Sequence, residues 1–152
     1  MHLLGFLLGS LLIAQLNPGY LPQDIEDAAE KTADKFVAAL LTAETDQLVE
    51  LCTDPFTFEG KQIKGKTQIK LHWLGYLVKY KSDLKKLDSG LVEVMDYKAA
   101  LKRFSKPPKK FSHLRLQQCR FAAVSFEHHN GIMLILSKNK KKDGWLVTAV
   151  TD

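Results

Sequence analysis

The sequence has 152 residues and a formal net charge of +5, with 45% hydrophobic and 26% charged residues. A chain of this length is one domain by size and can bury a substantial hydrophobic core. Its composition is that of an ordinary folded domain, which excludes an intrinsically disordered chain and a multi-pass membrane protein.

The first residues form a separate segment. Residues 3–16 are almost entirely apolar and are followed by Asn17-Pro18-Gly19. This run is shorter than the roughly 20 residues of a membrane-spanning helix and has the length of a signal-peptide core, although no Lys or Arg precedes it and no Ala-x-Ala motif follows. We expect residues 1–19 to be a signal peptide or N-terminal anchor, and residues 20–152 to be one exported domain (periplasmic, cell envelope or secreted). A buried N-terminal helix is the remaining alternative.

Helices are predicted early in the chain. Apolar residues at helical spacing indicate a first helix over residues 24–41, with Asp24 as its N-cap. A short second helix follows Thr45, and Pro55 prevents its continuation. A third helix is expected from Thr67 to Tyr80, and a fourth over residues 94–104.

Strands dominate the second half. A short strand is expected at residues 56–58, with Ile63 in a partner strand. Longer strands are expected at residues 114–127, 132–137 and 145–151, the last two joined by a lysine-rich turn that ends in Asp143-Gly144. The order predicts an α+β fold in which N-terminal helices pack in the concave face of a curved antiparallel sheet.

Four short patterns resemble the nuclear transport factor 2-like superfamily (SnoaL-like, cystatin-like cone fold). They are Ala33-x-x-Phe36-x-x-Ala39-Leu40, Asp46, Asp54-Pro55-Phe56-x-Phe58 and Asp143-Gly144-Trp145-x-Val147. The resemblance spans residues 25–152 and implies a cone with a pocket between the sheet and the long helices, where the enzymes of the superfamily hold a carboxylate or His. The isomerase pattern is missing here, because the first helix has no Tyr and the late strands offer only Glu127 in their interior.

Two groups of residues are candidates for a site. His72, Tyr76 and Tyr80 recur every four residues and therefore lie along one stripe of a helix, where they could line a pocket or form an aromatic core face. Glu127 begins the cluster Glu127-His128-His129, which could supply an acid–base pair. Asn130-Gly131 follows it, so this segment also has the composition of a hairpin turn.

Cofactors and metals are not indicated. The two cysteines, Cys52 and Cys119, lie in apolar contexts that favour buried thiols over a disulfide. A zinc site needs more ligands at close spacing. The lysines at 138–142 and at 102–110 could attract an anionic polymer, but no aromatic residues alternate with them, so nucleic-acid binding is not expected.

These observations favour a non-enzymatic domain that binds a small apolar molecule or a protein partner, with a homodimer through the sheet as one possibility. One alternative is a lyase or isomerase that uses His72 or Glu127, with Tyr76 as hydrogen-bond donor. Another is a cell-envelope protein that binds an anionic polymer through its lysine loops.

Overall fold

The structure is a computed structural model that describes residues 23–87 and 90–152. The expected leader or anchor at residues 1–19 lies outside the described residues. None of the described helices is long and apolar enough to cross a membrane.

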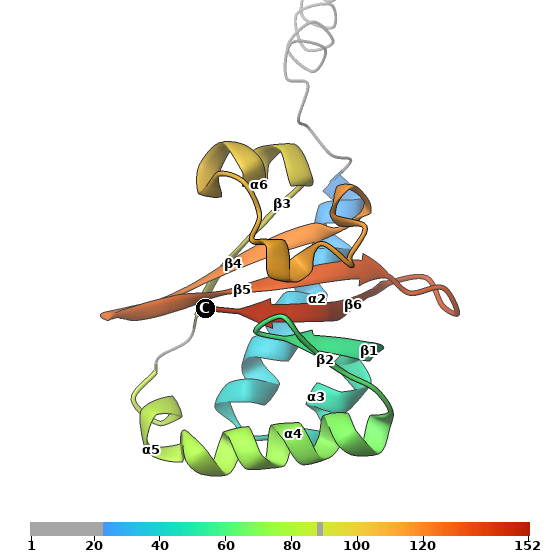
Figure 1. Cartoon of the computed structure of the whole chain (residues 1–152). Helices are drawn as coiled ribbons and strands as arrows, with labels where there is room; N and C mark the ends of the chain where they lie inside the picture. The colour runs from blue at the N-terminus through green and yellow to red at the C-terminus, as the bar shows by residue number, and fades with distance from the viewer. Residues whose placement is uncertain (1–22, 88–89) are drawn as a thin grey trace, which may run out of the picture.

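The described chain begins with two helices and ends with three consecutive strands (Figure 1). The helices are α2 (Gln23–Leu41), α3 (Thr45–Leu51), α4 (Lys66–Lys79), α5 (Lys81–Leu84), α6 (Tyr97–Phe104) and the 3₁₀ turns η1 (Lys109–Phe111) and η2 (Leu116–Gln118). The strands are β1 (Cys52–Phe58), β2 (Lys61–Ile63), β3 (Leu91–Met95), β4 (Arg120–Phe126), β5 (His129–Lys138) and β6 (Trp145–Thr151).

The strands of the described residues form one curved six-stranded sheet in the order β2-β1-β6-β5-β4-β3. The predicted hairpin near the end of the sequence is confirmed, since β5 and β6 pair antiparallel with Lys138 opposite Trp145. The sheet is mixed and not purely antiparallel as expected, because β1 pairs parallel to β6. The α+β class is therefore confirmed, with this correction to the pairing.

Helices α2, α3 and α4 pack against one face of the sheet, as predicted for the N-terminal helices (Figure 1). The helical rhythm of α2 places Ala29, Ala33 and Phe36 in the core with no exposed surface. Trp73 of α4 is 1% exposed and its ring centroid lies 5.5 Å from Phe36 and 5.6 Å from Phe56. The resemblance to the cone fold implies a deep pocket between the sheet and the helices, but these rings fill that space.

The other face of the sheet carries a second, smaller core. Helix α6 and the η1–η2 segment cover it (Figure 1). Phe111 of η1 and Leu116 of η2 are buried there against Phe121 and Ile135 of the sheet. The sequence predicts helices on one face of the sheet only, whereas α6 lies on the other face.

Several predicted boundaries are wrong. The strand expected at residues 56–58 begins at Cys52. Residues 94–104 do not form one helix: Met95 ends β3 opposite Phe121, and Asp96 then caps α6 by accepting a hydrogen bond from the Ala99 N–H at 2.8 Å. The strand expected at 114–127 begins only at Arg120, because η2 occupies the preceding residues. Val94 and Met95 fit the period of a helix but belong to β3, and Leu116 fits the expected strand but belongs to η2.

The two cysteines are free and buried, as the sequence favoured. Cys52 belongs to the core under α2–α4, whereas Cys119 belongs to the core under α6, on the opposite face of the sheet. Burial raises the pKa of Cys52 to about 12 and that of Cys119 to about 11. Both thiols are therefore protonated at neutral pH.

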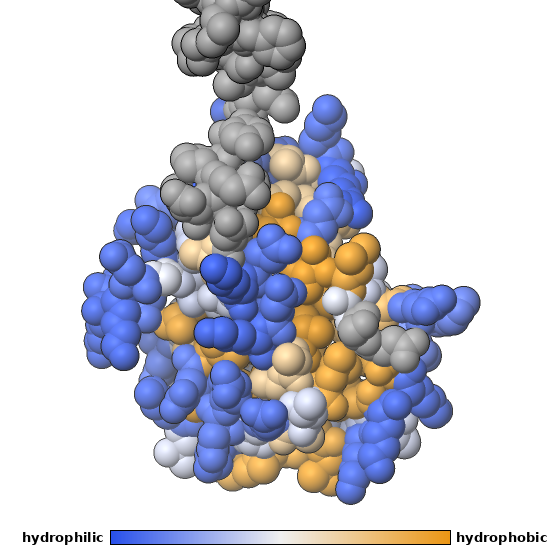
Figure 2. Space-filling model, turned by 180° about the vertical axis from the view of Figure 1, so that it is seen from behind, coloured by the Kyte–Doolittle hydropathy of each residue, from blue (hydrophilic) through white to orange (hydrophobic). Residues whose placement is uncertain are grey.

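The surface combines charged loops with one apolar helix face. The lysines of the β5–β6 turn are exposed. Seen from behind, apolar surface gathers down the middle of the molecule and along its lower edge, where α4 runs (Figure 2). Three outward side chains of α4 account for exposed apolar surface there: Leu71 is 56%, Leu74 is 42% and Val78 is 76% exposed. Helix α4 is thus apolar on both its buried and its outer side.

Candidate functional site

The helical stripe predicted from His72, Tyr76 and Tyr80 is present on α4 and its C-cap. The rings of His72 and Tyr76 are stacked with centroids 6.4 Å apart, and those of Tyr76 and Tyr80 lie 4.7 Å apart. All three side chains are half-buried, whereas Trp73 on the same helix points into the core. The four-residue spacing therefore places these polar aromatic groups at the border between the core and solvent.

Tyr76 and Tyr80 line a groove of about 300 Å³ at the open end of the layer between α4–α5 and the sheet. We call it the tyrosine groove. Its other walls come from the end of α2, from α5 and from the β4–β5 hairpin, which lie on the same side of the molecule (Figure 1). Its apolar lining residues are Leu40, Leu84, Leu87, Phe126 and Ile132, and its polar ones, apart from the tyrosines, include Asp83, Lys86, His129, Asn130 and Asp152.

Glycine shapes the hairpin wall of this groove. A Cβ at Gly131 would lie 2.5 Å from the carbonyl oxygen of Val124. Only glycine permits β5 to approach β4 so closely, at the point where the register between the two strands shifts. The start of β5, residues 129–132, thereby forms one wall of the groove.

Burial and nearby charges keep Tyr76 and His72 neutral. Burial raises the pKa of Tyr76, and Tyr80 and the carboxylates of Asp152 and Glu59 raise it further. Burial lowers the pKa of His72, and the charge of Lys61 adds to that effect. At neutral pH the groove therefore offers a phenolic O–H donor, and the imidazole beside it is uncharged.

His72 lies beside the tyrosine groove and not in it. It borders a shallow, open hollow of about 380 Å³ that shares Tyr76 and Tyr80 with the groove. Its ring centroid lies 4.5 Å from that of Phe58, and its Nε2 is buried with no hydrogen-bond partner among the described residues. An uncharged imidazole with a free nitrogen can accept or donate one hydrogen bond.

Glu127 does not line the tyrosine groove. It occupies the β4–β5 turn with an exposed side chain, and its Oε1 is 3.5 Å from Nε2 of the neighbouring His128. Neither residue lines the tyrosine groove, although His129 does. The turn interpretation of this cluster agrees with the structure, in which His128 has a φ of 60°.

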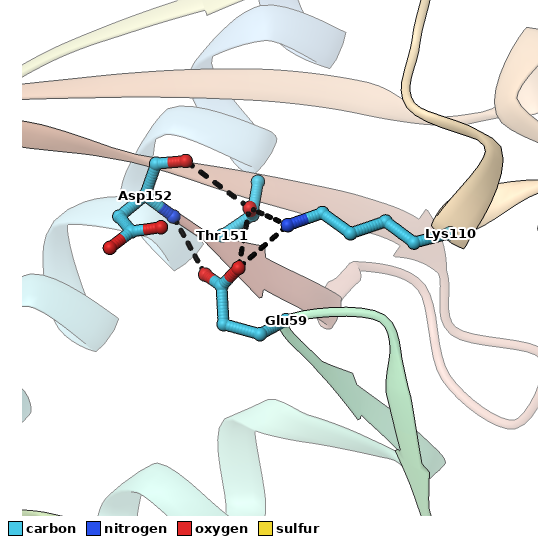
Figure 3. A network of polar contacts seen from close by, with 4 residues as sticks. All are labelled: Glu59, Lys110, Thr151 and Asp152. Carbon is cyan, nitrogen blue, oxygen red and sulfur yellow. Dashed lines mark hydrogen bonds and ion pairs between the residues drawn. The ribbon is translucent and has the colours of Figure 1, made fainter.

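Asp152 lines the groove and is held there by Glu59. Glu59 Oε1 accepts a hydrogen bond from the Asp152 N–H at 2.8 Å (Figure 3). Glu59 Oε2 accepts from Lys110 Nζ at 2.6 Å and lies 3.1 Å from the hydroxyl of Thr151, which itself accepts from Lys110 at 2.9 Å. This network joins the β1–β2 turn, η1 and the end of β6.

The turn that carries Glu59 has the geometry of a tight hairpin. Glu59 and Gly60 form a two-residue loop with φ values of 49° and 82°, the signs of a type I′ turn. A Cβ at Gly60 would lie 2.6 Å from Cβ of Lys110, so glycine lets the turn approach η1. Burial acts to raise the pKa of Glu59, but the hydrogen bonds from Lys110, the Asp152 N–H and Thr151, together with the charge of Lys110, hold it below its ordinary value of 4.5.

Two features limit the chemistry of this end of the cone. Among residues 28–87 and 90–152, the buried polar side chains are those of Thr57 and Thr148, so the filled interior holds no carboxylate or imidazole in that part of the chain. The described residues also contain no cluster of three or more His, Cys, Asp or Glu side chains arranged to hold a metal ion. The groove is thus an apolar-walled surface with a few hydrogen-bonding groups at its rim.

Comparisons with known proteins concern the fold. No protein-family model matches the chain, and no curated protein matches it either. Among solved structures, the chain is similar to a domain of unknown function with a cystatin-like fold from Nostoc punctiforme, at 11% identity and a TM-score of 0.41. The match covers 86% of this chain and 76% of that one.

Proposed function

We propose that this domain binds a small, largely apolar molecule with one hydrogen-bonding group in the tyrosine groove, without transforming it. The observation that carries the proposal is the composition of the groove: five apolar side chains form walls, and the Tyr76 and Tyr80 rings border them. Ligand sites are typically such concave, mostly apolar surfaces with a few placed polar groups, and about 300 Å³ is at the small end of their range. Export of the domain and its membership of the nuclear transport factor 2-like superfamily belong to the same proposal and rest on residue patterns.

The polar groups of the groove favour a ligand with a hydrogen-bond acceptor. The raised pKa of Tyr76 keeps its hydroxyl protonated, so it can donate. The network around Glu59 fixes the backbone of Asp152 at the rim, which limits the reorganisation needed on binding. The filled aromatic core behind the groove restricts the ligand to the mouth of the cone.

The proposal can be tested with 2-naphthol, a bicyclic apolar probe with one hydroxyl group. We expect amide resonances of Gly131, Ile132 and Leu84 to shift when the isotope-labelled full chain is titrated. Tyr76→Phe removes the hydroxyl that is proposed to donate to the ligand and should weaken binding about two- to tenfold, the effect of one hydrogen bond. Tyr97→Phe, a half-buried tyrosine on the opposite face of the sheet, is the matched control and should leave the affinity unchanged.

Other results would overturn the proposal. Probe-induced shifts confined to residues outside the groove would contradict it. If instead no probe binds and the chain self-associates through Leu71, Leu74 and Val78, the outer face of α4 is a protein interface, the second form of binding that the sequence suggested. Native mass spectrometry of the chain purified from its expression host would show either a retained small molecule or a bare oligomer.

The catalytic alternative is supported by one observation, the free Nε2 of the uncharged His72 beside the Tyr76 ring. A neutral imidazole is a competent general base at neutral pH. If the wild-type chain but not His72→Phe converts a retained molecule during incubation, a catalytic reaction replaces the binding proposal: a change in mass would indicate a lyase, and a change in chromatographic retention at constant mass an isomerase.

A further inference from the structure

A second concave site lies on the opposite face of the sheet, beneath α6. It is a slot of about 90 Å³ bounded by α6, by the Ser105–Pro108 connection that follows it and by strands β4 and β5. We call it the α6 slot. Figure 1 shows α6 above the sheet, whereas α4 and α5 of the tyrosine groove lie below it.

The walls of the α6 slot are almost wholly apolar. Phe104, Phe111, Phe121, Met133 and Ile135 are among the lining residues. Phe111 and Ile135 are 1% and 3% exposed, so they form a fixed floor, whereas Phe104 is 47% exposed at the rim. An alkyl group that enters the slot is removed from water on several sides, and burial of its methylene groups favours binding.

The slot is too small to enclose a drug-sized ligand. A dry cavity of about 150 Å³ lined by similar residues accommodates benzene, and the α6 slot is smaller, at about 90 Å³. It is also open on one side, so a narrow chain can enter end-on and continue over the exposed ring of Phe104. This size and shape fit one unbranched alkyl chain.

The α6 slot carries only positive charge. Lys106 is the one charged residue in its lining, and no carboxylate lines it. The neighbouring Arg103 and Lys110 are engaged with Glu93 and Glu59, whereas Lys106 is exposed and makes no ion pair with any described carboxylate. An apolar slot with one free cation at its edge is complementary to an alkyl chain that carries a single negative charge.

We propose that the α6 slot binds a free single-chain alkyl carboxylate, with the chain end between α6 and the sheet and the carboxylate at Lys106. The backbone supports this arrangement at the rim. Ser105, between Phe104 and Lys106, has a φ of 65° that non-glycine residues rarely adopt, and it ends α6 so that the next residue returns to the slot. This site is independent of the tyrosine groove and of the function proposed there.

The test uses two probes of equal chain length, sodium octanoate and 1-octanol, titrated into the isotope-labelled full chain. Both should shift the amides of Leu101, Ser105 and Ile135, and octanoate should bind about two- to fivefold more tightly, as expected for one exposed ion pair. Lys106→Met should remove that difference without changing the affinity for octanol. Lys102→Met removes the same charge from an exposed position of α6 outside the slot lining and should change neither affinity.

A second variant tests the slot itself. Ala100 is 7% exposed and lines the slot; Ala100→Leu adds carbon atoms into the open space and should abolish binding of both probes. Equal affinities for octanoate and octanol in the wild-type chain would overturn the proposal, as would equal effects of Lys106→Met and Lys102→Met. A dimer in sedimentation velocity that Ala100→Leu or Lys106→Met dissociates would also overturn it, because a second copy of the chain would then occupy the slot. Shifts confined to Gly131 and Ile132 would assign the probes to the tyrosine groove instead.

Discussion

The carboxylate of Glu59 should stabilise the fold through the network that holds the end of β6. It accepts hydrogen bonds from Lys110 at 2.6 Å and from the Asp152 N–H at 2.8 Å, and lies 3.1 Å from the Thr151 hydroxyl. Hydrogen bonds to a charged group contribute about 1.5–3 kcal/mol when buried, and exposed ion pairs about 0.2–1 kcal/mol. The side chain of Glu59 is 36% exposed, so we expect Glu59→Gln to lower the free energy of unfolding by about 1–2 kcal/mol at pH 7.

The stabilisation by the Glu59 carboxylate should decrease as the pH falls. The pKa of Glu59 is held below its ordinary value of 4.5 in the folded state. The carboxylate therefore contributes stability that is fully present above the unfolded-state pKa and is lost as the pH falls through the folded-state pKa. The difference in unfolding free energy between wild type and Glu59→Gln should shrink below about pH 4.

Urea unfolding followed by circular dichroism at pH 7 and pH 3 measures both quantities. Glu93→Gln is the matched control, because Glu93 also pairs with a cation, Arg103, but is 60% exposed. It should cost less than about 1 kcal/mol. A double-mutant cycle of Glu59→Gln with Lys110→Met isolates the interaction between these two side chains. Equal losses for Glu59→Gln and Glu93→Gln, or a loss for Glu59→Gln that is the same at both pH values, would refute the reasoning.

Two further predictions concern the cores. Trp73→Ala should lower the free energy of unfolding by about 3–5 kcal/mol, because Trp73 is 1% exposed at the centre of the aromatic cluster. Thermal denaturation should show this as a fall in Tm of roughly 2–4 °C per kcal/mol, and a shift of under about 2 °C would contradict the packing described here. Neither thiol should react with a disulfide reagent at pH 8 in the native chain, because burial raises the pKa of Cys52 to about 12 and that of Cys119 to about 11. Both should react in urea, and rapid labelling of either thiol in the native state would show that it is accessible.

Local sequence patterns determined the parts of this protein that depend on neighbouring residues. Two apolar runs and the Asp143-Gly144 turn between them predicted the final hairpin, since both strands and their connection lie within one short stretch. The four-residue spacing of His72, Tyr76 and Tyr80 predicted their common stripe, because the helix repeat fixes which side chains share a face.

A segment whose apolar residues fit both a strand and a helix is predicted incorrectly from its sequence. Residues 91–95 were missed as a strand because Val94 and Met95 also fit the helical pattern that continues into α6. Pairing of β3 with β4, with Met95 opposite Phe121, decides the matter, and that partner lies far away in the sequence. The parallel pairing of β1 with β6 is likewise a long-range contact that neither strand encodes alone.

The candidate sites depend on tertiary structure for the same reason. Asp152 carries no local signal, and it reaches the tyrosine groove because Glu59, 93 residues earlier, accepts its N–H. The α6 slot exists because α6 crosses to the face of the sheet opposite α2, a choice that the apolar side of α6 does not specify. Periodicity determined which side of each element is buried. The partner that buries it, and the space left between them, were decided only when distant segments packed together.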